Sequence, residues 1–244
     1  MSFLDPDDSS PGPPRMDQGT RLWGMLRRRQ VLVPTWRGWL ALLLILATLA
    51  WLALREAHSF LAMTEPVSGG ALVVEGWASD HVLEQAVAEF GRGSYEKLYV
   101  TGGPIEAGAP LAEYRTYAER GAAVLLKLGL AAEEVQAVPA PPVRQDRTYA
   151  AMIALRHWFE QHGSMPAKVH LVTRGPHARR SRLVLQHALG ERVEVGVTAV
   201  PVLEYDTVHW WRSSAGVRDV IGEALAYSYV RWFPPEAALA SEHR

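Results

Sequence analysis

The sequence contains no cysteine, which excludes disulfide bonds, thiolate nucleophiles and thiolate metal ligands together. It also lacks an excess of charge, because 25 basic and 26 acidic residues leave a formal net charge of −1. Proteins that bind nucleic acid normally carry a basic excess, so nucleic acid is not an expected partner. The absence of cysteine suits an oxidising compartment.

Several catalytic and nucleotide-binding patterns are missing as well. The histidines show neither H-x-x-x-H nor H-E-x-x-H spacing, so no metal site is expected. There is no G-x-S-x-G nucleophile elbow, and both the G-x-G-x-x-G fingerprint and the P-loop are absent. No cofactor can be named from motifs alone.

A long apolar run does occur, at residues 38–54, and it has the length needed to cross a hydrocarbon core. Tryptophans lie near its ends, as in an interfacial aromatic belt, and arginines concentrate before it: Arg21, Arg27, Arg28, Arg29 and Arg37. The positive-inside rule then predicts a single-pass inner-membrane anchor with a cytoplasmic N-terminus and a periplasmic main domain. A cleaved signal peptide and a buried core helix are the alternatives, but the charged region is long and no clear small-x-small cleavage site follows the run.

Composition divides the chain into five parts. The first 20 residues have almost no large apolar side chains and predict disorder. We expect a basic cytoplasmic tail at 1–35, the membrane anchor at 36–56, a linker at 57–69, an α/β domain at 70–234 and a polar C-terminal tail at 235–244.

Within the main domain, short apolar runs alternate with segments of helical period. Strands are predicted at 71–75, 97–101, 135–138, 169–173 and 193–200. Helices are predicted at 79–90, 111–128, 146–162, 176–189 and 217–233. This alternation indicates right-handed crossovers and a mainly parallel five-stranded sheet covered on both faces, whose ligands bind at the carboxyl ends of the strands.

The loop after the fourth predicted strand is rich in cations. Arg174, His177 and Arg180 surround a helix start at Pro176, where unpaired backbone N–H groups favour an anion. His177 is expected at a loop edge, held toward its neutral form by the helix dipole, so its substitution should barely change stability. The alternative is an ordinary solvated helix face.

Other loops at the same edge add candidate residues. Thr101, Gly102 and Gly103 offer backbone amides that suit a phosphate or carboxylate, although a simple turn has the same composition. Glu75 ends an apolar strand, where it would need a cation such as Arg174 or Arg180 unless it is solvated. Asp146 is either a helix cap or a functional carboxylate.

These motifs, in this order, resemble the YdcF/SanA/ElyC-like family of bacterial envelope proteins over residues 71–232. The resemblance implies a Rossmann-like three-layer sandwich, tethered to the inner membrane and associated with cell-wall or surface-polysaccharide biogenesis. It adds Thr148, Thr173 and Arg218 to the candidate ligand-binding residues. Arg147 stands where the family has Asn, and Glu75 where it often has Gly. One family member resembles an S-adenosylmethionine binder, so a nucleotide-like cofactor is an alternative ligand.

Two classes of function stay open. The protein is either an enzyme of envelope glycan or lipid-carrier metabolism, with Glu75 or His177 moving protons, or a module that binds an anionic ligand without turning it over.

Trp210 and Trp211, after the fifth predicted strand, either pack into the core or line a rim that faces the membrane; the nearby anchor favours the rim.

Overall fold

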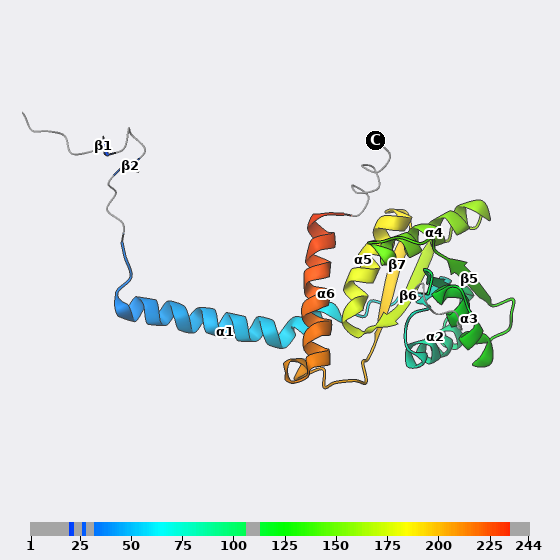
Figure 1. The fold of residues 1–244 in the computed structure, drawn as a ribbon, viewed down its shortest axis with the longest axis horizontal. Helices are drawn as coiled ribbons and strands as arrows, with labels where there is room; N and C mark the ends of the chain where they lie inside the picture. The colour runs from blue at the N-terminus through cyan, green and yellow to red at the C-terminus, as the bar shows by residue number, and fades with distance from the viewer. Residues whose placement is uncertain (1–19, 22–25, 28–31, 106–112, 235–244) are drawn as a thin grey trace, which may run out of the picture. The chain divides into compact units, whose positions relative to one another are not determined.

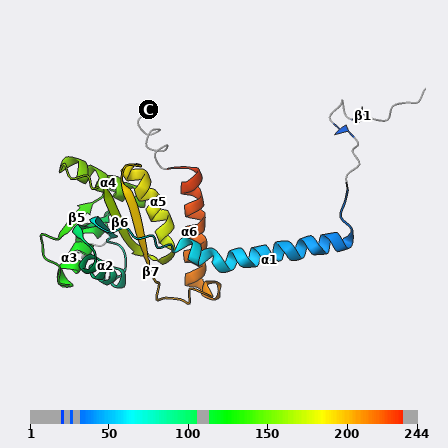
Figure 2. The same cartoon turned by 180° about the vertical axis from the view of Figure 1, so that it is seen from behind.

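The computed structural model describes residues 20–21, 26–27, 32–105 and 113–234 (Figures 1 and 2). Most of the predicted N-terminal tail and the whole predicted C-terminal tail lie outside these residues. The chain forms two compact units, Met1–Leu49 and Ala50–Arg244. The first contains two short antiparallel strands, β1 (Thr20–Arg21) and β2 (Leu26–Arg27), and the first half of helix α1 (Trp36–Leu61).

The second unit contains the five predicted strands, all parallel, in the order β5-β4-β3-β6-β7. They are β3 (Gly70–Glu75), β4 (Tyr95–Gly102), β5 (Val135–Pro139), β6 (Lys168–Arg174) and β7 (Glu194–Val200). Each begins and ends within two residues of its prediction. The strong β propensity of these apolar runs and the turn residues between them account for this agreement.

Helices cover both faces of the sheet. They are α2 (Asp80–Arg92), α3 (Tyr117–Lys127), α4 (Arg147–Gln161), α5 (Ala178–Leu189) and α6 (Ser214–Trp232), with 3₁₀ turns η1 (Gly175–His177) and η2 (Trp210–Arg212). On one face, Leu72 and Val74 of β3 pack with α2 and α3; on the other, Val73 packs with α4 and α5. β3 is apolar throughout because both its faces are covered. The fold is therefore a Rossmann-like three-layer sandwich, as predicted.

Helix α3 begins later than the predicted start at residue 111. The Thr116 hydroxyl accepts a hydrogen bond from the backbone N–H of Glu119 (3.1 Å), and the Glu119 carboxylate accepts one from the backbone N–H of Thr116 (3.0 Å). This capping box fixes the helix start at Tyr117, and its Thr-x-x-Glu signature was present in the sequence. Residues 111 and 112 lie outside the described part of the chain.

The strand order places a switch in direction at β3. The chain moves from β3 to β4 and β5 on one side, then returns past β3 to form β6 and β7 on the other. Loops leaving β3 and its neighbours therefore diverge at the carboxyl edge, where open α/β sheets bind ligands.

Helix α1 is long and apolar enough to cross a membrane: its most apolar 18-residue window has a mean hydropathy of 1.9 and none of it is buried. The helix continues to Leu61, so residues 57–61, predicted as linker, are helical. His58 and Leu61 are buried against the α/β domain, and this packing extends the helix past the apolar run.

The tryptophan pair packs rather than lining a rim. Trp210 is 2 % exposed and lies in a small core with Leu61 and Val220, while its indole N–H donates to the Leu54 carbonyl (3.1 Å). Trp211 meets it edge-on, with ring centroids 5.8 Å apart. The rim hypothesis is thus wrong for Trp210, because a partner for its N–H and an apolar pocket are both available in the fold.

Candidate functional site

A cavity of about 580 Å³ lies at the carboxyl ends of β3 and β4, beside the start of α4. Its wall combines aromatic and apolar side chains with hydroxyl groups, one carboxylate and two arginines. Among the lining residues are Glu75, Trp77, Thr101, Gly103, Arg147 and Thr148. A cavity with a mainly apolar wall and a few polar groups has the character of a small-molecule site.

The Thr-Gly-Gly segment forms one side of this cavity. Thr101 is 1 % exposed, and within the described residues its hydroxyl has no hydrogen-bond partner. A Cβ at Gly102 would lie 2.7 Å from the Cβ of Tyr117, so this glycine allows β4 to approach α3. A Cβ at Gly103 would meet open space. The segment therefore leaves room for a ligand next to an unsatisfied buried hydroxyl.

The start of α4 faces the same cavity. Asp146 precedes the helix in a left-handed conformation (φ 55°), and its side chain makes no capping hydrogen bond. Thr148, in the first turn, lines the cavity together with Arg144 and Arg147. A helix N-terminus without a side-chain cap, flanked by two guanidinium groups, favours an anion.

Glu75 lines the cavity, although it is only 2 % exposed. Its Oε2 accepts hydrogen bonds from the hydroxyls of Thr173 (2.5 Å) and Ser181 (3.4 Å). Its Oε1 lies 3.3 Å from Nε2 of His177. Both carboxylate oxygens are thus engaged by groups from β6, η1 and α5.

Beyond Glu75, the contacts continue as a chain of charges. His177 Nδ1 lies 2.8 Å from Glu223 Oε1, and Arg180 donates to both oxygens of Glu223 at 2.7 and 3.1 Å. Arg180 Nη2 is also 3.0 Å from His177 Nδ1. A protonated ring nitrogen cannot accept a hydrogen bond, so Arg180 and His177 Nδ1 both donate to the Glu223 carboxylate. Glu75, His177, Arg180 and Glu223 thus form an ionic cluster. Its two carboxylates and two cations make it neutral.

The cluster fixes the charge of each member. Burial alone would raise the pKa of Glu75, but His177, Thr173 and Arg180 hold it below its ordinary value. Burial would lower the pKa of His177, but Glu75 and Glu223 raise it to about 9. The pKa of Glu223 falls to about 2, against the effect of burial, because His177 and Arg180 donate to it. His177 is therefore an imidazolium near neutral pH.

Three expectations about His177 and Arg180 are thereby corrected. The helix dipole does not keep His177 neutral, because two carboxylates in contact with its ring outweigh it. His177 is 8 % exposed instead of lying at a loop edge, so its substitution should affect stability. The Glu223 carboxylate occupies the donors of Arg180 that were expected to bind an external anion, and Arg180 also donates to Thr148 (3.4 Å).

Arg174 and Arg218 have different surroundings from those expected. Arg174 donates to Asp219 (2.8 Å), whose other oxygen accepts from the Tyr205 hydroxyl (2.9 Å). Arg174 also lies 3.5 Å from Glu204. Arg218 is exposed on α6, where its Nε donates to the Ser214 carbonyl (3.4 Å), and it is not among the described residues that line the cavity. Neither arginine is placed to hold a ligand there.

Sequence reasoning missed Glu223, which completes the ionic cluster. It also missed two residues of the cavity wall, Arg144 and Trp77. The Trp77 ring contacts the His177 ring edge-on, with centroids 5.0 Å apart. One signal could have found Glu223. Asp219 and Glu223 are four residues apart in an apolar helix, so they share one face and need cations from elsewhere in the fold.

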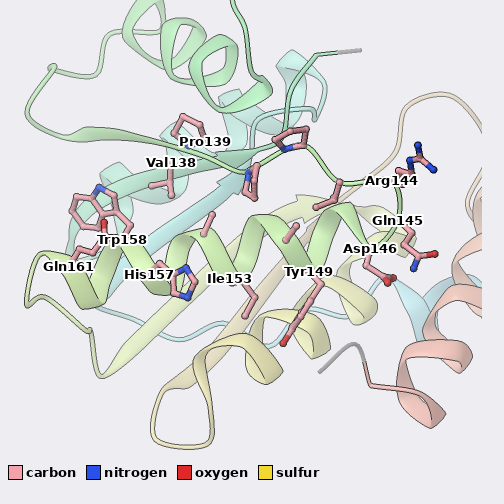
Figure 3. A pocket seen from close by; sticks show the side chains of 15 residues that line it. Val138, Pro139, Arg144, Gln145, Asp146, Tyr149, Ile153, His157, Trp158 and Gln161 are labelled. Atoms are coloured by element: carbon pink, nitrogen blue, oxygen red, sulfur yellow. The ribbon is translucent and has the colours of Figure 1, made fainter. Parts of the chain in front are cut away.

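A second groove, of about 790 Å³, runs along α4 next to the edge strand β5. Figure 3 shows Tyr149, Ile153 and His157 following one another along the helix, with Asp146 at its start. Asp146 thus belongs to this groove and not to the wall that contains Glu75. Among the described residues, no group of three His, Asp or Glu side chains is arranged to hold a metal ion.

Scans of the sequence against family models and against curated proteins found no match.

The ionic cluster predicts a definite pH dependence of stability. The pKa of His177 is about 9 in the folded chain and 6.5 ordinarily, so its contribution is complete below pH 6.5 and is lost as the pH rises through 9. The pKa of Glu223 is about 2 against an ordinary 4.5, so its contribution is complete above pH 4.5 and is lost as the pH falls through 2. The free energy of unfolding, measured with urea in detergent, should fall by about 3 kcal/mol between pH 6 and pH 10 because of His177.

The matched control is the exposed His162 at the end of α4. His177→Gln should remove most of the loss of stability between pH 6 and pH 10, whereas His162→Gln should leave that loss unchanged. If the loss persists in His177→Gln, another group is responsible for the titration.

Proposed function

We propose that the protein is anchored in the inner membrane by α1 and acts in cell-envelope biogenesis by binding a phosphate-bearing glycan or lipid in the cavity at Glu75 and Thr101. The observation that carries the binding part is the Thr101 hydroxyl. Thr101 lines the cavity, and its buried hydroxyl has no partner among the described residues. A buried hydroxyl left unpaired costs about 1–3 kcal/mol, which a ligand oxygen would recover.

The length and hydropathy of α1 support the membrane anchoring. The orientation follows from the arginines that precede the apolar run, since positive residues remain on the cytoplasmic side. The α/β domain is then periplasmic. This location agrees with the absence of cysteine and with the envelope role that the family resemblance implies.

Three features support an anionic ligand. The open space at Gly103 allows a ligand to approach the backbone, and the start of α4 lacks a side-chain cap. Arg144 and Arg147 supply positive charge on the cavity wall. The cations of the ionic cluster are neutralised internally, so Arg144, exposed in the loop before α4, is the group expected to balance a phosphate.

The contacts of Glu75 favour binding over catalysis. Its oxygens accept from Thr173 and Ser181 and contact His177, and its lowered pKa makes it a weak base. An enzyme acting on the same ligand is the second candidate. It is supported by the imidazolium of His177 one contact behind the cavity wall, from which a proton could reach Glu75.

Isothermal titration of the full chain in detergent tests the proposal with inorganic pyrophosphate as the probe and S-adenosylmethionine as the alternative. Gly103→Leu should reduce pyrophosphate affinity at least about tenfold, equivalent to about 1.4 kcal/mol, because its side chain enters the open space. Thr101→Val should weaken binding by about 0.5–1.5 kcal/mol through the lost hydrogen bond.

Gly91→Leu is the matched control, since a Cβ at Gly91 in α2 also meets open space but lies away from the cavity lining. It should bind as the unmodified chain does. Equal affinity of Gly103→Leu and Gly91→Leu would place binding outside the cavity. Tighter binding of S-adenosylmethionine than of pyrophosphate would favour the nucleotide-like ligand.

A further inference from the structure

Helix α6 is apolar on more sides than its packing in the domain requires. One face carries Asp219 and Glu223, which pair with Arg174 and Arg180. A second face packs Val220 and its neighbours against Leu61 at the end of α1. A third face is exposed, although five large apolar residues follow one another along it: Ile221, Leu225, Tyr229, Trp232 and Phe233.

The exposure of this outer face is substantial. The five side chains are between 47 % and 79 % exposed, and no described segment of the chain covers them. Their spacing of three and four residues places them in one stripe along the helix and its C-terminal end. A continuous apolar stripe of this kind marks an interaction surface, whereas scattered apolar residues do not.

The charges of α6 restrict the partner. Its two carboxylates, Asp219 and Glu223, are turned toward the domain and paired, whereas its two arginines, Arg218 and Arg231, are exposed. The outer side of the helix thus presents apolar and aromatic groups with positive charge beside them. This combination suits the boundary between acyl chains and anionic headgroups, where tryptophan and tyrosine are enriched.

The position of α6 within its compact unit points to the same partner. The apolar run of α1 ends at Leu54, whose carbonyl accepts from Trp210 in the turn that leads into α6. Two turns later, the Phe60 ring meets Tyr227 of α6 edge-on, with centroids 5.8 Å apart. Helix α6 therefore packs against the turns that directly follow the apolar run (Figure 1).

We propose that the outer face of α6 lies on the lipid surface and inserts its five apolar side chains into the headgroup and acyl boundary. A chain that leaves the bilayer at Leu54 brings α6 within about two helical turns of the membrane, close enough for the exposed stripe to meet lipid. Arg218 and Arg231 bind headgroup phosphates. This inference rests on the proposed membrane anchoring and is independent of the ligand in the cavity.

The absence of native cysteine allows a direct test with single-cysteine variants of the full chain. Leu225→Cys and Tyr229→Cys are labelled with an environment-sensitive fluorophore and reconstituted into vesicles that contain anionic lipid. Leu44→Cys, within the apolar run, reports insertion of α1, and Glu133→Cys, exposed on the α/β domain, reports an aqueous site. Quenching by aqueous iodide and by brominated lipid is measured for each label.

The expected result is iodide quenching several-fold lower at positions 225 and 229 than at 133, with clear quenching by brominated lipid. Iodide quenching equal to that at 133, with Leu44→Cys protected, would overturn the α6 proposal while leaving the anchor intact. Protection from iodide without quenching by lipid would also overturn it, and would assign the face to a second copy or to residues 235–244. A label at position 44 that iodide quenches as strongly as the label at 133 would instead refute the anchoring itself.

Discussion

Replacing Glu75 with alanine is expected to lower the free energy of unfolding by about 3–5 kcal/mol, the usual result of removing one partner from a buried charge pair. Glu75 is 2 % exposed and contacts the imidazolium of His177 while accepting from Thr173 and Ser181. Its loss leaves two hydroxyls without their acceptor and a buried cation with one carboxylate instead of two. Urea unfolding followed by tryptophan fluorescence measures the change.

Two comparisons separate this effect from a general sensitivity to mutation. Glu160→Ala breaks an exposed pair with Arg156 (2.7 Å) and should cost at most about 1 kcal/mol. The double variant Glu75→Leu/His177→Leu removes the buried cation together with its partner, so it should be more stable than Glu75→Ala. If Glu75→Ala costs no more than Glu160→Ala, the ionic cluster does not hold the ends of β3 and β6 together.

Trp210→Ala is expected to lower the free energy of unfolding by about 3–5 kcal/mol, because it leaves a cavity in place of the largest fully buried side chain among the described residues. It also removes the donor to the Leu54 carbonyl and the contact with Leu61, both of which hold the end of α1 against the domain. A shift of the urea midpoint, with an increase in proteolytic cleavage near residues 54–61, would measure both consequences.

Trp36→Ala is the matched control for this variant. Trp36 is 71 % exposed at the start of α1, in the other compact unit, so its removal should change the unfolding of the α/β domain by less than about 0.5 kcal/mol. Equal destabilisation by the two substitutions would contradict a specific role of Trp210 in docking α1.

The neutral ionic cluster changes the electrostatic character of the site. The sequence presents Arg174, His177 and Arg180 as three cations around a helix start, yet each is paired with a carboxylate that the chain itself supplies. What remains for an anion is the start of α4 and Arg144 in the loop before it. The expected phosphate site therefore moves from the start of α5 to the start of α4.

The sequence alone determined the five strands, the crossover helices, the apolar span and the Thr-Gly-Gly turn. These features depend on local properties: β propensity, hydrophobic period, turn residues and the length of an uncharged run. It also placed Glu75, Thr101 and Thr173 at one edge of the sheet, because parallel strands bring their carboxyl ends together. Thr101 and Glu75 are in fact opposite each other in the β3–β4 register.

Only the tertiary structure decided which charges meet. Glu223 lies 46 residues from His177 and 43 from Arg180, and Trp210 lies 156 residues from its acceptor Leu54. No local periodicity encodes such contacts, since they depend on how α6 packs against α5, η1 and η2. That packing buries Glu223 among cations, raises the pKa of His177 to about 9 and makes an apparent anion site a closed ionic cluster. A charge in a sequence is only a potential ligand, because burial and the partner that folding supplies decide what it can still bind.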